Sequence, residues 1–81
     1  MKESLLIYNS VFTEAFAIPL EKLDSLKYQD IMEWDSVGHM GLMASLEEAF
    51  KIEMEIDDII DFSSYQKGKE ILSKYNISWN E

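Results

Sequence analysis

Apolar residues recur in this chain at intervals of three and four, the spacing of helix faces. No segment shows the period of two that strands require. Within residues 3–17, one apolar helix face consists of Leu5, Tyr8, Phe12, Ala15 and Phe16. Pro19 disfavours helical backbone at Ile18, so we expect this first helix to stop there.

Residues 18–35 form a long connection whose apolar side chains are spaced to pack on a core. These side chains are Leu20, Leu23, Leu26, Ile31 and Met32. Connections of this length in compact domains tend to be functional or well packed. The pattern therefore predicts an ordered loop that contains some short helix.

The clearest helical pattern begins at Asp35 or Ser36, either of which can act as its N-cap. The buried stripe of this second helix consists of Leu42, Met43, Leu46, Ala49 and Phe50. The pattern breaks after Ile52. We therefore expect the second helix to end near that residue.

Two further helices are expected in the last third of the chain. Residues 57–62 form a short acidic helical turn. A last helix begins at Ser63, which has capping-box spacing to Gln66, and runs to about Tyr75. Its inward residues are Tyr65, Leu72 and Tyr75, and the tail from Asn76 is expected to be loose.

The fold class that follows is all-α, a small helical bundle with one long loop after its first helix. We expect three longer helices and one short helix. Because the chain has 81 residues, it has room for a single domain, residues 1–81.

The charge balance narrows the classes of partner. Seven Lys and no Arg stand against sixteen Asp and Glu, which gives a formal net charge of −9. Nucleic acid and anionic membrane surfaces are disfavoured because both require a basic face. An acidic field instead steers basic protein surfaces toward the chain. No apolar run approaches the ~20 residues that span a bilayer, so we expect no membrane insertion. The N-terminus lacks the pattern of a signal peptide, and we therefore expect a cytoplasmic monomer.

Asp35, Ser36 and His39 raise the possibility of a serine hydrolase. Ser36 and His39 share a helix face at i, i+3. A hydrolytic serine also needs an oxyanion hole and a substrate pocket, and the G-x-S-x-G elbow is missing from the sequence. We therefore expect no catalytic residue, and we expect His39 to lie at the helix surface or edge.

No metal site is expected either. The chain has a single His and no Cys, which disfavours a transition-metal centre. The acidic cluster of Asp57, Asp58 and Asp61 lacks the spacing and the glycine of a calcium loop. We interpret it as a solvated helix start.

The second helix also carries an apolar line that is displaced from its buried stripe. Ser36 heads this line, which continues through Val37, Met40, Ala44, Glu47 and Glu48. Gly38 and Gly41 lie beside Ser36, although each should cost ~1 kcal/mol relative to Ala inside a helix. The pattern predicts a face that binds a partner, with open backbone near Ser36.

Asp35-Ser36-Val37, followed by Leu42, Leu46-Glu47-Glu48, Phe50 and Ile52, resembles an acyl carrier protein. The resemblance spans nearly the whole chain. It implies a 4′-phosphopantetheine arm esterified to Ser36 and a cargo held as a thioester on the terminal thiol of that arm. It further implies a phosphopantetheinyl transferase and acyl-transferring, ligase or synthase enzymes as partners. Their basic surfaces would dock on Asp35, Val37, Met40, Ala44, Glu47 and Glu48.

Elementary chemistry agrees with this resemblance. A chain without Cys has no thiol of its own, so thioester chemistry requires a thiol from an attached group. A phosphodiester at a helix N-terminus meets free N–H groups and the positive end of the helix dipole. Asp24-Ser25-Leu26 repeats the triplet, but only Ser36 precedes a long amphipathic helix. The sequence therefore assigns the site to Ser36.

The chain departs from the family at two positions and leaves alternatives open. In the family, acidic residues are common two and five positions after the modified serine, whereas this chain has Gly38 and Gly41 at those positions. Electrostatic attraction of basic partners close to Ser36 is therefore weaker. An aminoacyl or hydroxyacyl carrier loaded by an adenylating ligase uses the same fold and arm. An unmodified helical interaction module is a third possibility.

The many aromatic residues at inward positions predict a short or polar cargo, because rigid rings resist opening of a channel.

Overall fold

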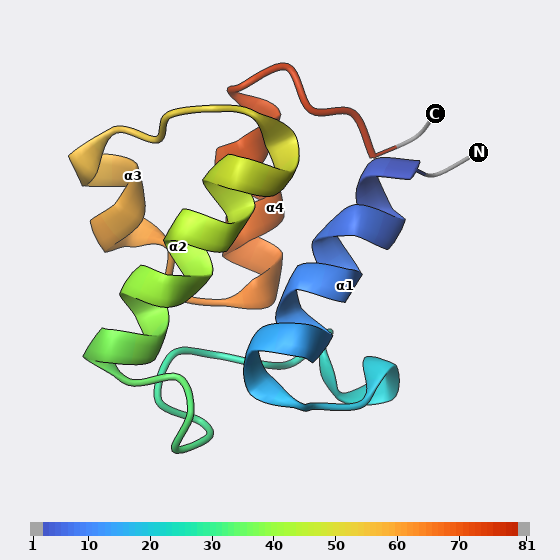
Figure 1. The fold of residues 1–81 in the computed structure, drawn as a ribbon, viewed down its shortest axis with the longest axis vertical. Coiled ribbons are helices and arrows are strands. Elements are labelled where there is room, and N and C mark those ends of the chain that lie inside the picture. The colour runs from blue at the N-terminus through green and yellow to red at the C-terminus, as the bar shows by residue number, and fades with distance from the viewer. Residues whose placement is uncertain (1–2, 80–81) are drawn as a thin grey trace.

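The computed structural model describes residues 3–79 and is all-α over that range (Figure 1). Its elements are α1 (Glu3–Phe16), the 3-10 helix η1 (Leu20–Lys22), α2 (Ser36–Phe50), α3 (Ile56–Asp61) and α4 (Tyr65–Ser73). In Figure 1, α2 lies in front of α4, with α1 on one side and α3 on the other. The predicted set of three longer helices and one short helix, with a long loop after the first, is confirmed.

Helix α1 ends two residues before the predicted stop. Ala17 takes a left-handed backbone, with φ 52°, and Pro19 follows. Tyr8, Phe12 and Phe16 are buried as predicted. The prediction for Ala15 was wrong, because Ala15 is exposed and borders a groove that it shares with Ser45 and Ala49 of α2.

Helix α2 begins where the sequence indicated. Asp35 is its N-cap, with extended backbone and a side-chain Oδ1 that accepts the Gly38 N–H at 2.8 Å. Ser36 is therefore the first helical residue. The helix ends at Phe50, because Lys51 takes a left-handed backbone with φ 58°. Of the predicted stripe, Leu42, Met43 and Leu46 are buried, whereas Ala49 and Phe50 are only half-buried.

The connection from residue 17 to residue 35 is ordered and packs on the core. Leu23 and Leu26 are buried, and the backbone pairs with the segment before α4 through Tyr28 N to Ser63 O and Tyr65 N to Leu26 O. Two side chains depart from the prediction: Leu20 is 61% exposed and Met32 is 91% exposed. They lie where the backbone turns, at the start of η1 and in the bend before Trp34.

Helix α4 begins two residues later than predicted and has a different cap. The Ser64 hydroxyl accepts the Lys67 N–H at 2.9 Å, so the capping box predicted at Ser63 is not formed. Gln66 instead points its amide at Asp24. The described part of the tail, which ends at Trp79, is packed rather than loose, because the Trp79 indole donates to the Lys69 carbonyl and its ring lies 5.1 Å from the Tyr8 ring. Residues 80–81 lie outside the described residues.

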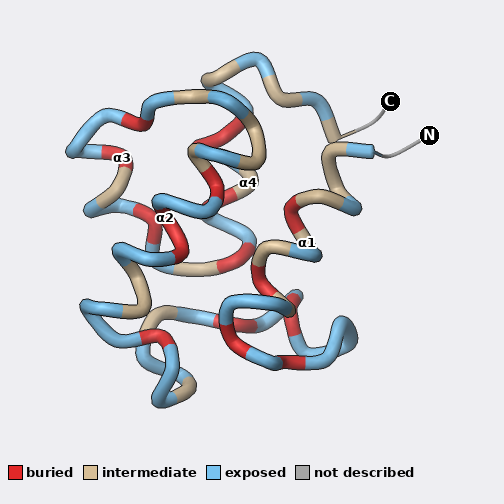
Figure 2. The backbone as a smooth tube through the Cα atoms, in the orientation of Figure 1, coloured by how far each residue is buried: buried red, intermediate tan, exposed pale blue. Residues whose placement is uncertain are grey.

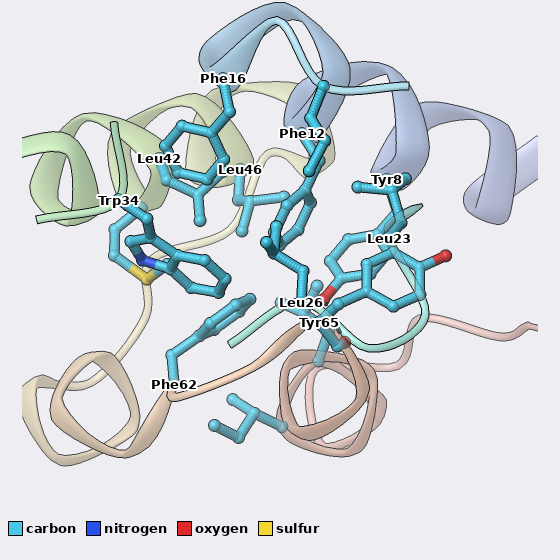
Figure 3. Packing of buried hydrophobic residues seen from close by; sticks show 14 of the residues in the cluster. Tyr8, Phe12, Phe16, Leu23, Leu26, Trp34, Leu42, Leu46, Phe62 and Tyr65 are labelled. Carbon is cyan, nitrogen blue, oxygen red and sulfur yellow. Dashed lines mark hydrogen bonds between the residues drawn. The ribbon is translucent and has the colours of Figure 1, made fainter. Parts of the chain in front are cut away.

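The core consists of buried residues from α1, α2, α4 and the segments between the helices (Figure 2), and six of its side chains are aromatic (Figure 3). Phe12 lies at its centre. Its ring contacts those of Tyr8, Phe16, Trp34, Phe62 and Tyr65, with centroid separations of 5.0 to 6.4 Å. Helix α4 approaches this cluster at Gly68, where a Cβ would overlap the Phe62 ring and the Tyr8 hydroxyl. Dense ring packing leaves these positions little freedom to change volume.

Helices α3 and α4 are joined through a buried carboxylate. Asp58 accepts hydrogen bonds from the Lys74 ammonium and the Tyr75 hydroxyl, and that hydroxyl in turn accepts the Glu55 N–H. The bonds from Lys74 and Tyr75 hold the pKa of the Asp58 carboxyl below its usual 3.8. Asp58 thus fixes the short α3 against the end of α4.

Asp58→Asn is expected to lower the free energy of unfolding at pH 7 by roughly 1–3 kcal/mol, because it weakens a buried, charge-assisted network. Since the folded pKa of Asp58 is depressed, its contribution is complete above the unfolded pKa and is lost as pH falls through the folded pKa. Urea unfolding at pH 7, 5 and 3 should therefore show the deficit shrinking toward low pH. The exposed Asp57→Asn is the control, and an equal deficit in both variants would contradict the role given to Asp58.

Candidate functional site

Ser36 lies exposed at the first position of α2. The earliest intrahelical bond runs from His39 N to Asp35 O, so the N–H groups of Ser36 and Val37 precede the helical hydrogen-bond ladder. The other candidate, Ser25, lies in a turn after η1 and is not followed by an α-helix. Of the two serines, only Ser36 combines exposure with a helix start.

His39 does not lie free at the surface or edge as expected. Its Nδ1 accepts a hydrogen bond from the Trp34 indole at 3.0 Å, so Nε2 carries the ring hydrogen and donates to the Ile59 carbonyl at 2.8 Å. The half-buried ring also packs edge-on to Tyr28, with centroids 5.5 Å apart. Both ring nitrogens are therefore engaged, and neither is left to act as a base toward Ser36.

A small apolar pocket opens between α2 and α3 beside Ser36. Its volume is about 310 Å³. The residues that line it are Tyr28, Ser36, His39, Met40, Ile59, Ile60, Phe62 and Ser63. The site serine thus borders a surface where an apolar group can be held.

An exposed apolar face continues outward from this pocket. Val37 is 80% exposed and Met40 is 56% exposed on α2, and Ile56 and Ile60 are 74% and 71% exposed on α3. Sequence reasoning missed the two isoleucines because it interpreted this segment only as an acidic turn. Their spacing of four residues was the available signal.

The surroundings of this face are acidic. Neither α2 nor α3 contains a Lys, and although Lys74 pairs with Asp58, the other acidic residues of the two helices (Glu47, Glu48, Asp57 and Asp61) supply negative charge. Nothing in these two helices would repel a basic partner. The face therefore combines an apolar centre with an acidic border.

The six predicted docking residues fall into two groups. Val37, Met40, Ala44 and Glu48 are exposed on α2. Asp35 is exposed, but its carboxylate caps the helix. Glu47 is half-buried, and its Oε2 accepts the Met54 N–H at 2.8 Å, which fastens the segment after α2. Asp35 and Glu47 thus stabilise the chain itself.

The two glycines near Ser36 have different surroundings. A Cβ at Gly38 would overlap the Glu33 carbonyl, so glycine is required there by the close approach of the preceding loop. A Cβ at Gly41 would meet no atom within 4 Å. The open backbone expected beside Ser36 is therefore found at Gly41 alone.

Two further kinds of feature concern residues 3–79, a metal centre and a membrane span. No three His, Asp or Glu side chains in that range are grouped so that they could share a metal ion. None of the helices described has both the length and the apolar character needed to cross a bilayer. Within the acidic cluster, Asp58 is bound to Lys74 and Tyr75.

Comparison with models of known protein families, with curated proteins and with solved structures finds no match. The function must therefore be inferred from the residues of the chain and their arrangement. That arrangement is a small helical bundle in which exposed Ser36 begins α2, beside an apolar pocket and two helices, α2 and α3, that contain acidic residues and no Lys.

Proposed function

We propose that the chain is an acyl carrier protein in which Ser36 bears 4′-phosphopantetheine and the arm carries acyl groups as thioesters. One observation carries the proposal: Ser36 is exposed at the start of α2 and also lines the apolar pocket. The sequence resemblance around Asp35-Ser36-Val37 supports it. The carrier then presents its cargo to acyl-transferring, ligase or synthase enzymes.

The geometry suits a phosphodiester on Ser36. The N–H groups of Ser36 and Val37 lie at the positive end of the α2 dipole, where an anion is stabilised. The bound arm would supply the thiol that the sequence lacks. Because the transferase supplies the base for attachment, engagement of both His39 nitrogens is compatible with a carrier and opposes a hydrolase.

The apolar character of the pocket favours an acyl cargo over an aminoacyl cargo. Ile59 and Ile60 of α3 form one side of the pocket, and Met40 of α2 forms part of the other side. An ammonium group placed among these side chains would lose hydration without gaining an acidic partner. An acyl chain gains from the same contacts.

The wild-type chain, co-expressed with a phosphopantetheinyl transferase of broad specificity, is expected to gain the mass of one phosphopantetheinyl group. Intact-mass spectrometry measures this directly. A chain that stays unmodified while a known carrier is modified in parallel would overturn the proposal and favour an unmodified interaction module.

Met40→Glu and Glu48→Lys are each expected to lower kcat/KM of the transferase several-fold, because they alter the apolar centre and the acidic border of the docking face. The effect of Glu48→Lys should shrink as salt rises, since exposed charges are screened beyond ~10 Å at 0.1 M. Glu47 is unsuitable for this test because its carboxylate binds Met54 N.

Glu21→Lys on η1 is the matched control, since it makes the same change in net charge away from α2 and α3. If all three variants behave like the wild type, partners dock on another face. Equal losses with Glu21→Lys and Glu48→Lys would show that only net charge matters.

A further inference from the structure

His39 forms the inner wall of the pocket beside Ser36. Behind it lies Trp34, which does not line the pocket and is fully buried. The two rings are stacked, with centroids 6.2 Å apart and planes inclined by 15°. Phe62 also lines the pocket and is 1% exposed. Figure 3 shows Phe62 and Trp34 within the core. The pocket therefore ends at His39, and the aromatic core begins directly behind it.

Two hydrogen bonds hold the His39 ring in this position. Trp34 Nε1 donates to Nδ1 at 3.0 Å, and Nε2 donates to the Ile59 carbonyl at 2.8 Å. Ile59 lines the opposite side of the pocket on α3. One side chain therefore closes the inner end of the pocket and also ties α3 to α2. Sequence reasoning assigned no such role to His39.

We propose that His39 determines how long an apolar group the pocket accepts, by closing its inner end so that a short group fits and a long one does not. The inference rests on the proposed function, in which the arm on Ser36 delivers that group. The pocket volume of about 310 Å³ lies at the lower end of the ~300–1,000 Å³ of small-molecule sites. Removing the imidazole extends the pocket to the face of Trp34 and releases Ile59.

The first test uses the unmodified chain and two simple probes, 1-butanol and 1-octanol. Each fully buried methylene tightens binding about fourfold, so four more methylenes would give roughly 200-fold if all entered the pocket. In the wild type we expect both alcohols to shift the NMR methyl signals of Met40 and Ile60, with octanol binding less than about tenfold tighter than butanol. In His39→Ala we expect octanol to bind at least about fiftyfold tighter than butanol.

Matched variants separate closure of the pocket from a general structural role. Ile56→Ala removes an exposed apolar side chain of α3 that does not line the pocket and leaves the bridge intact, so the octanol-to-butanol ratio should stay at its wild-type value. His39→Gln places an amide that can donate to the Ile59 carbonyl, and it should restore a low ratio. Trp34→Phe removes the bond to Nδ1 and also reduces the buried ring behind His39, so it should raise the ratio, and it replaces His39→Ala in the test if that variant does not fold.

The proposal is overturned if the wild type shows the full 200-fold gain, if butanol leaves the pocket methyls unshifted, or if neither His39→Ala nor Trp34→Phe raises the ratio. A second series uses the modified chain bearing two- to eight-carbon acyl groups. The melting temperature should stop rising at a short acyl length in the wild type and keep rising in His39→Ala, because a buried chain stabilises the native state. If His39 had only a structural role, His39→Ala should lower the melting temperature of every acylated form by the same amount.

The two sets of experiments also separate this inference from the proposed function. A chain that accepts no phosphopantetheine would refute the carrier assignment. The alcohol titrations need no arm and would still decide whether His39 closes the pocket.

Discussion

Ser36→Ala is expected to abolish attachment of the phosphopantetheinyl group, whereas Ser25→Ala keeps it complete. Both serines follow an Asp and precede an aliphatic residue, so the triplet alone does not separate them. Their surroundings do, because Ser36 begins the 15-residue α2 and lines the pocket, while Ser25 lies in a turn between buried Leu23 and Leu26. The measurement is intact mass after incubation with transferase and coenzyme A.

The Ser36→Ala result is informative only if the variant folds. Ser36 is exposed and Asp35 supplies the cap, so removal of the Ser36 hydroxyl should leave the melting temperature nearly unchanged. Modification that persists in folded Ser36→Ala protein would place the arm elsewhere. Loss of modification in Ser25→Ala would point to recognition of the loop by the transferase.

Gly68→Ala is expected to destabilise the chain by about 3 kcal/mol, the upper part of the usual range for overpacking. The added methyl would overlap the Phe62 ring and displace the Tyr8 hydroxyl, which donates to the Tyr65 carbonyl at 2.7 Å. Loss of that bond leaves a buried polar group unpaired. These costs exceed the ~1 kcal/mol that Ala gains over Gly in a helix.

Gly41→Ala is the matched control, since it makes the same change within a helix where no atom lies within 4 Å. It should stabilise the chain by up to ~1 kcal/mol. A domain of this size shifts its melting temperature by roughly 4–8 °C per kcal/mol, so the two variants should move in opposite directions by clearly resolved amounts. A stable Gly68→Ala would mean that α4 can move away from Phe62.

The sequence was sufficient for the features that depend on local pattern. Pro19 marked the end of α1, and Asp35 marked the start of α2. The buried stripe of Leu42, Met43 and Leu46 followed from helical periodicity. These features depend on neighbours within a few residues, so periodicity and capping rules can predict them.

Features that depend on backbone atoms outside the helix that carries the residue were not predictable in this way. The partner of His39 Nε2 is the Ile59 carbonyl, and every residue carries a carbonyl, so no side-chain pattern identifies it. Gly38 is required by the Glu33 carbonyl for a similar reason. Glu47 was expected to face a partner because no pattern indicates its bond to the Met54 N–H.

The contact between Trp79 and Tyr8 bears on how the protein can be attached to a support. It brings the last described turn of chain against α1, at the end of the molecule opposite the start of α2 (Figure 1). A label, bead or fused domain joined near either end by a flexible linker would thus leave Ser36 and the neighbouring face pointing away from the attachment. Binding of partner enzymes could then be measured on an immobilised chain whose Ser36 face stays accessible.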